Sequence, residues 1–262
     1  MRILRAAMDC FTLTVFFVAA ALGAYVQSVT GFALGMILIA VMVGGGLVTV
    51  PVITAVVSLL SLVNVLMALH GHLQHLNRRL LRHLTVGLVP ALALGVWLLA
   101  RLDAEARWML EGLLGLFIVG GSLSMLIRPQ PLTRVSSTAS CLVAGAAGGV
   151  LGGMFSASGP VIGWFVYRQP LMVVEIRATL LAVFAFTTSL RTLVVGYQGG
   201  LTEEVWVMAA LGLPVVVCGT LAGRRFAPPF SELTLKRFAF GLLLAMGFWT
   251  LVRALSEGFF QP

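Results

Sequence analysis

The chain has 262 residues, of which 60% are hydrophobic and only 10% are charged. A soluble domain carries about 25% charged residues, so this composition excludes a soluble globular protein. The net charge of +8 comes almost entirely from arginines that lie between apolar runs. That arrangement is typical of the cytoplasmic loops of membrane proteins rather than of nucleic-acid binding.

The first half of the chain opens with a long stretch that carries no charge. No Asp, Glu, Lys, Arg or His occurs from Cys10 to Leu69. Because a helix crosses a bilayer with roughly 20 apolar residues, this stretch can hold two or three crossings. Glycine and polar residues divide the half into apolar segments over 10–27, 33–43 and 51–69, a basic loop over 71–83, and helices over 84–100 and 108–127.

The second half repeats this order. A glycine-rich apolar stretch over 141–151 is interrupted at 152–160, a short apolar piece follows, and longer helices are expected over 178–196, 205–223 and 238–252. Each half thus has a broken pair of short segments and then three longer helices, an internal symmetry typical of transporters. We predict an all-α polytopic membrane protein of about eight spans, with transmembrane repeats over 1–130 and 131–262.

Loop charge indicates how the two halves are oriented. The most basic connections, over 71–83 and 224–237, should both be cytoplasmic by the positive-inside rule. The first of them follows the first long helix of its half, whereas the second follows the second long helix. The halves are therefore expected to be inverted repeats.

The two interruptions, at 28–32 and 152–160, are the best candidates for a binding site. Irregular backbone at membrane depth must be buried in protein or line a watery cavity. A helix that begins there presents free N–H groups and the positive end of its dipole, which attract an anion. A purely structural alternative is that the glycines only let helices pack closely. The expected substrate-binding residues at the breaks are Gln27, Ser28, Thr30, Gly31, Gly35, Ser156, Ser158 and Gly159.

Three further polar residues lie within the spans. Asn64, like Gln27, is either a substrate ligand or a partner in a hydrogen bond between helices. Arg191 either contacts substrate, because charge inside a membrane is costly and usually functional, or extends to the interface from near the end of its helix. Both Asn64 and Arg191 are kept as candidate substrate-binding residues. Glu111 is expected to be a favourable charge at the start of a helix, with proton transfer as the alternative role.

No metal or cofactor site is predicted. The cysteines Cys10, Cys141 and Cys218 are far apart and lack the paired spacing of zinc ligands. His70, His72, His75 and His83 cluster in or beside the basic loop, which contains no Asp, Glu or Cys. They are interpreted as solvated loop residues.

The residues at the breaks resemble those of the sulfite exporter TauE/SafE family of membrane permeases. The resemblance rests on the stretch from Gln27 to Gly35 in the first half, and on 148–160 followed by Arg177-Ala178-Thr179 in the second. It implies a multi-pass transporter, commonly of eight spans, for sulfite, sulfoacetate or other small organic anions. The chain departs from the fuller glycine pattern at Phe32, Ala33, Ser156 and Ser158, positions that would shape the pocket.

The sequence thus predicts a secondary transporter that works in the export direction, rather than an enzyme. Its expected location is the bacterial inner membrane, and its expected partners are a small anionic solute and the lipid bilayer. No nucleic acid is expected, and a homodimer is left open. The alternatives are an intramembrane enzyme, for which no convergent nucleophile and base are found within the spans, and a non-transporting scaffold subunit, which would not need paired helix breaks.

Overall fold

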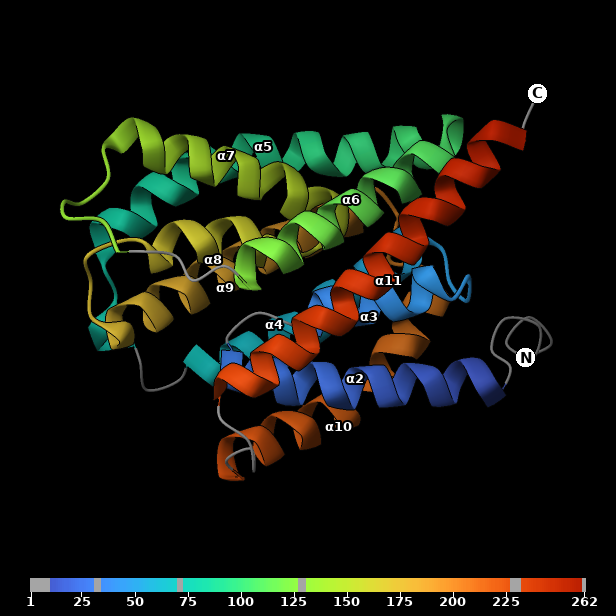
Figure 1. The fold of residues 1–262 in the computed structure, drawn as a ribbon, viewed down its shortest axis with the longest axis horizontal. Helices are drawn as coiled ribbons and strands as arrows, with labels where there is room; N and C mark the ends of the chain where they lie inside the picture. The colour runs from blue at the N-terminus through green and yellow to red at the C-terminus, as the bar shows by residue number, and fades with distance from the viewer. Residues whose placement is uncertain (1–9, 31–33, 70–72, 127–130, 227–231, 261–262) are drawn as a thin grey trace.

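A computed structural model describes residues 10–30, 34–69, 73–126, 131–226 and 232–260, and these residues form helices and short connections without any strand. Figure 1 shows the arrangement and gives the labels used below. The helices of the first half are α2 (Cys10–Thr30), α3 (Leu34–Gly44), α4 (Val50–Leu69), the short η1 (Leu73–His75), α5 (Arg78–Glu105) and α6 (Arg107–Leu126). Those of the second half are α7 (Thr138–Phe155), α8 (Gly159–Tyr167), α9 (Val173–Tyr197), α10 (Glu203–Arg225) and α11 (Glu232–Phe260).

Six of these helices, α2, α4, α5, α7, α9 and α10, are long and apolar enough to cross a membrane. Two shorter apolar helical stretches, Leu34–Gly44 and Gly241–Ser256, add to them. Large apolar side chains such as Trp97, Leu193 and Trp249 are exposed on the outer surface, where hydrocarbon rather than water suits them. The prediction of an all-α polytopic membrane protein is confirmed.

Several helices begin or end outside the limits expected from the sequence. Helix α5 begins at Arg78 because the Asn77 side chain caps it, accepting a hydrogen bond from the Leu80 N–H at 3.0 Å. The arginines assigned to a basic loop therefore lie in the first turns of a helix. Helix α7 continues through Gly152 and Gly153, which were predicted to belong to the break, because both glycines are buried against neighbouring helices. The second break is thus confined to residues 156–158.

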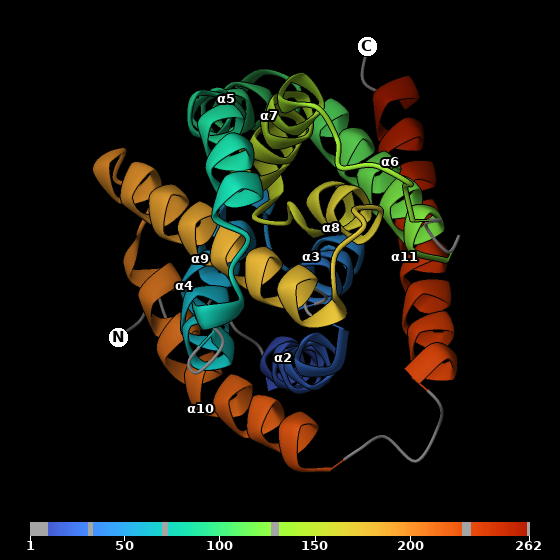
Figure 2. The ribbon, with the colours of Figure 1, turned by 90° about the vertical axis from the view of Figure 1, so that its left-hand side faces the viewer.

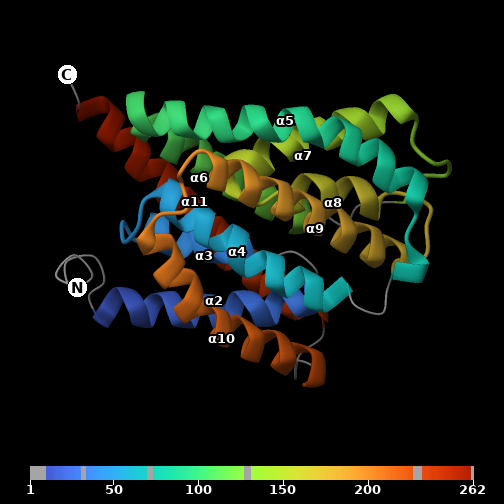
Figure 3. The ribbon, with the colours of Figure 1, turned by 180° about the vertical axis from the view of Figure 1, so that it is seen from behind.

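Helices from opposite halves pack against each other in pairs, as the three views in Figures 1, 2 and 3 show. Helix α5 lies along α7, and α10 lies along α2. Helix α4 packs against α9 at the centre, and α6 packs against α11. The short helices α3 and α8 lie among these pairs, so the second helix break falls inside the protein (Figure 2).

Glycines bring α5 and α7 into backbone contact. Cβ atoms built at Gly95 and Gly145 would collide with the backbone carbonyls of Val150 and Leu84, respectively. One built at Gly149 would lie 2.6 Å from the Leu88 carbonyl oxygen and 2.9 Å from the Ala91 Cβ. Such close approach is the way in which small residues drive helix association in membranes.

We expect Gly149→Ala to destabilise the protein by about 1–3 kcal/mol, because backbone cannot move aside for the added methyl group. Gly241→Ala is the matched control, since a Cβ at Gly241 meets nothing within 4 Å. There the helical preference of alanine should leave the stability unchanged or slightly raise it. Thermal unfolding of both variants in detergent measures the difference. Equal unfolding temperatures would contradict the backbone contact.

Candidate functional site

The second helix break forms one wall of a cavity at the centre of the protein. Helix α7 ends at Phe155, and the next residue, Ser156, has a left-handed φ of 53° that turns the chain out of the helix. Helix α8 then begins at Gly159, with Pro160 in its first turn, where a missing N–H costs no hydrogen bond. The cavity has a volume of about 40 Å³. Its lining comes from α2, α3, α4, the α7–α8 turn and α9: Gln27, Gly35, Ser61, Val65, Gly152, Ser156, Ala157, Ser158, Gly159, Phe184, Thr187, Thr188 and Arg191.

Among the described residues, Arg191 supplies the only formal charge in this lining. Its side chain is 1% exposed, so it does not reach the interface, and that alternative is excluded. Nε donates to the Gly153 carbonyl at 2.9 Å, while Nη1 and Nη2 donate to the Thr54 carbonyl and hydroxyl oxygens, both at 2.9 Å. Nη1 also donates to the Ser58 hydroxyl. A guanidinium group carries five N–H donors. The described residues accept from four of those of Arg191, so one donor remains for a ligand.

Every partner of Arg191 within the described part of the chain is neutral. The nearby stretch from Cys10 to Leu69, which includes the first break, contains no charged residue at all. A buried charge without a counter-charge is costly unless something neutralises it. The arrangement therefore favours an anion in the cavity.

Hydroxyl groups surround the cavity and can donate to such an anion. Ser61, Ser158 and Thr188 are each less than 10% exposed, and their hydroxyls have no hydrogen-bond partner among the described residues. The Ser156 hydroxyl lies 2.9 Å from that of Ser58, which in turn donates to the Thr54 carbonyl at 2.9 Å. The cavity thus combines one fixed positive charge with several neutral donors.

The first break contributes through a chain of buried side-chain amides. Gln27 Oε1 accepts a hydrogen bond from the Leu34 N–H at 2.9 Å, and so caps the start of α3. Gln27 Nε2 donates to Asn64 Oδ1 at 2.6 Å, and Asn64 Nδ2 donates to the Thr220 hydroxyl at 2.6 Å. This chain joins α2, α3, α4 and α10, with Gln27 at its cavity end.

The structure brings together six of the ten predicted binding residues: Gln27, Gly35, Ser156, Ser158, Gly159 and Arg191 line the cavity. Asn64 lies behind Gln27, in the interhelical role that was its alternative. Ser28 faces α10 instead, where its hydroxyl lies against Gly223 and donates to the Tyr25 carbonyl at 2.7 Å. The Thr30 side chain and Gly31 lie outside the described part.

Sequence reasoning missed Ser61, Thr187 and Thr188 as lining residues. Thr187 and Thr188 precede Arg191 by four and three positions, so all three share one face of α9. That spacing could have identified both threonines once Arg191 was a candidate. Ser61 has no such signal, because its place depends on how α4 packs against α9.

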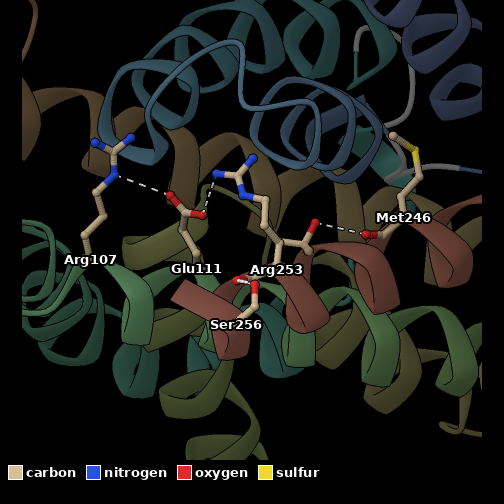
Figure 4. Close-up of polar contacts among 6 residues, drawn as sticks. Arg107, Glu111, Met246, Arg253 and Ser256 are labelled. Atoms are coloured by element: carbon tan, nitrogen blue, oxygen red, sulfur yellow. Dashed lines mark hydrogen bonds and ion pairs between the residues drawn. The ribbon is translucent and has the colours of Figure 1, made fainter. Parts of the chain in front are cut away.

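Glu111 is not a charge at the start of a helix, as predicted, but part of a buried ion-pair cluster (Figure 4). Its side chain is 3% exposed and lies 3.0 Å from Arg253 Nη2 of α11 and 3.3 Å from Arg107 Nε. Glu111 lies in the second turn of α6, beyond the first turn in which the helix dipole acts, and α11 brings Arg253 alongside it. None of these three residues lines the cavity.

Fold and cavity define a multi-pass membrane protein with a buried, positively charged site at a helix break. The sequence model of the family described as Sulfite exporter TauE/SafE matches residues 15–250, and the chain belongs to this family. The resemblance noted from the sequence is thereby confirmed.

Two relatives support this assignment. The chain is 45% identical over 234 residues to a protein of Cupriavidus necator named "Probable sulfite/organosulfonate exporter TauE", covering 89% of this chain and 91% of the relative. It is 31% identical over 188 residues to "Probable inner membrane transporter protein TsaS" of Comamonas testosteroni, covering 68% of this chain and 75% of that protein. No solved structure matches the chain.

Proposed function

We propose that this protein exports small anions, sulfite or organosulfonates, across the bacterial inner membrane, and that the central cavity is its binding site. The observation that carries the proposal is Arg191, fully buried and bonded only to neutral groups within the described residues. The names of the two relatives, an exporter of sulfite or organosulfonates and an inner membrane transporter, support the substrate class and the location. Membership of a transporter family favours transport over the enzyme and scaffold alternatives.

The anion is bound by the Arg191 guanidinium, by the free hydroxyls of Ser61, Ser158 and Thr188, and by the first N–H groups of α8. No covalent chemistry is required of these groups. The inside-negative membrane potential expels anions, so it can drive export without a second ion.

Alternating access follows from the inverted-repeat arrangement, which is part of the proposal, as is the division into 1–130 and 131–262. In chain order, α2 to α6 of the first half correspond to α7 to α11 of the second half. Under this correspondence the α5–α7 contact is equivalent to the α10–α2 contact, and the α4–α9 and α6–α11 contacts are each equivalent to themselves. That pattern is expected of two repeats related by a pseudo-two-fold axis. The cavity lies between α4 and α9, where the two halves meet.

Flux in proteoliposomes tests the proposal, with sulfite, sulfoacetate, methanesulfonate, sulfate and acetate as solutes. We expect saturable uptake of sulfite or a sulfonate, and about a tenfold weaker apparent affinity in Ser158→Ala, because a hydrogen bond to a charged group is lost. Ser28→Ala is the matched control, since the Ser28 hydroxyl faces α10 rather than the cavity. Equal effects of the two variants would place the anion elsewhere, and silence across all solutes from folded protein would refute the transport of these anions.

A further inference from the structure

A second hollow lies on the opposite side of α8 from the central cavity. It is a groove of about 280 Å³ between α6 and α8, lined by Phe117, Gly120, Gly121, Ser124, Pro160, Val161 and Trp164. Its one hydroxyl, that of Ser124, already donates to the Gly121 carbonyl at 2.8 Å. The side chains of the lining therefore offer a ligand mainly apolar contacts, which a hydrocarbon chain can make.

Glycine forms the groove and opens it to the outside. Gly120 is exposed, and a Cβ built on it would meet nothing within 4 Å. Gly121, by contrast, touches the α8 side, where a Cβ would lie 2.9 Å from Pro160 Cγ. Gly121 thus lets α8 pack closely against α6, while Gly120 leaves an open slot beside it.

A positive charge lies at the outer end of this groove. The Arg168 guanidinium carbon sits 4.5 Å from the centroid of the Trp164 ring, a cation–π contact that fixes the charge beside the lining. Arg168 makes no ion pair within the part of the chain that the structure describes. Its backbone also accepts a hydrogen bond from Leu132 at 2.7 Å, so the Arg134-containing connector lies at the same end. A fixed arginine next to an exposed tryptophan is a typical headgroup-level arrangement.

On α8 the groove lining ends at Trp164, one helical turn before Arg168. Pro160 lies beside the central cavity, and Arg168 lies eight residues further on, about 12 Å along a helix. The hydrocarbon of one leaflet is about 15 Å thick, half of the bilayer core. An acyl chain that follows α8 from Arg168 to Pro160 would cover most of one leaflet.

We infer that this groove binds one acyl chain of an anionic phospholipid of the cytoplasmic leaflet, with the phosphate at Arg168. Anionic lipids are concentrated in that leaflet, and the basic connector favours the same side. Ser158 and Gly159 line the central cavity while Pro160 and Val161 line the groove, so the end of the chain packs behind the turn that faces the cavity. This site is separate from the proposed transport function and is tested without a transport assay.

Native mass spectrometry of the purified protein with added phosphatidylglycerol or phosphatidylcholine tests the inference. We expect one tightly bound phosphatidylglycerol per chain, and weaker binding of phosphatidylcholine. Gly120→Leu should abolish this binding by filling the slot, whereas Gly241→Leu, which adds the same side chain to open space on α11, should not. Arg168→Gln should weaken binding about fivefold, the effect of one cation near an anionic headgroup.

Two results would overturn the inference. If Gly120→Leu binds phosphatidylglycerol as well as the unmodified protein does, the lipid is bound to the general outer surface and not in the groove. Conversion of a dimer to a monomer by Gly120→Leu alone, seen in the same spectra, would assign this face to a second copy of the chain instead.

Discussion

Replacing Arg191 by glutamine is expected to weaken the apparent affinity for the transported anion by about 100-fold or more, the usual effect of removing one member of a buried, hydrogen-bonded charge pair. No other described residue of the cavity lining carries a charge that could replace that of Arg191. Arg191→Lys keeps the charge but loses the planar fork that reaches Thr54, Ser58 and Gly153 together. The lysine variant should therefore transport measurably, although less well than the parent. Concentration-dependent flux in proteoliposomes measures both.

A matched control removes an arginine elsewhere in the membrane helices. Arg101→Gln on α5 deletes a charge that is 59% exposed and pairs with Glu105 at the surface, so its effect on affinity should be small. Thermal unfolding separates a binding defect from a folding defect, because Arg191 also ties α9 to α4 and α7. Unchanged affinity in folded Arg191→Gln would show that the cavity does not bind the anion.

The membrane fold could be predicted because it depends on features that are local in the sequence. Long apolar runs, interrupted by glycine and by arginine-containing connections, require helices in a bilayer wherever the helices pack. The limits of α5 and α7 were less accurate. An Asn77 cap extends the first into the basic segment, and α7 stays helical through two glycines that pack closely on other elements, Gly152 on Thr187 of α9 and Gly153 on the α5 backbone.

The site could be predicted only in part, because the packing of the helices determines which side chains face the cavity. Ser28 and Ser158 have similar surroundings in the sequence, yet one faces α10 and the other the cavity. From the sequence, the Arg191 side chain could either contact substrate or extend to the membrane interface. The packing of α4 against α9 decides between these roles, because α4 supplies three of the hydrogen-bond acceptors of Arg191. Ser61 gave no signal at all, since its position is set by a contact between halves that no local pattern reveals.

Glu111→Gln is expected to destabilise the protein by about 2–3 kcal/mol, somewhat less than the usual loss for a fully buried ion pair, because Arg253 is 28% exposed. The glutamine keeps the shape of the side chain but leaves the Arg253 charge without its carboxylate. Transport affinity should not change, because the cluster lies outside the cavity lining. Thermal unfolding in detergent, together with flux, measures both effects.

The two arginines of the cluster should differ in a double-mutant cycle. Arg107 is 56% exposed and one helical turn from Glu111, so its coupling to Glu111 should be below about 1 kcal/mol. Arg253 joins α11 to α6, and a Cβ added at Gly46 would lie 2.8 Å from its Nη1, so it also contacts the turn after α3. Its coupling should be larger. Equal couplings of Arg107 and Arg253 would contradict the role of the cluster as a tie between helices.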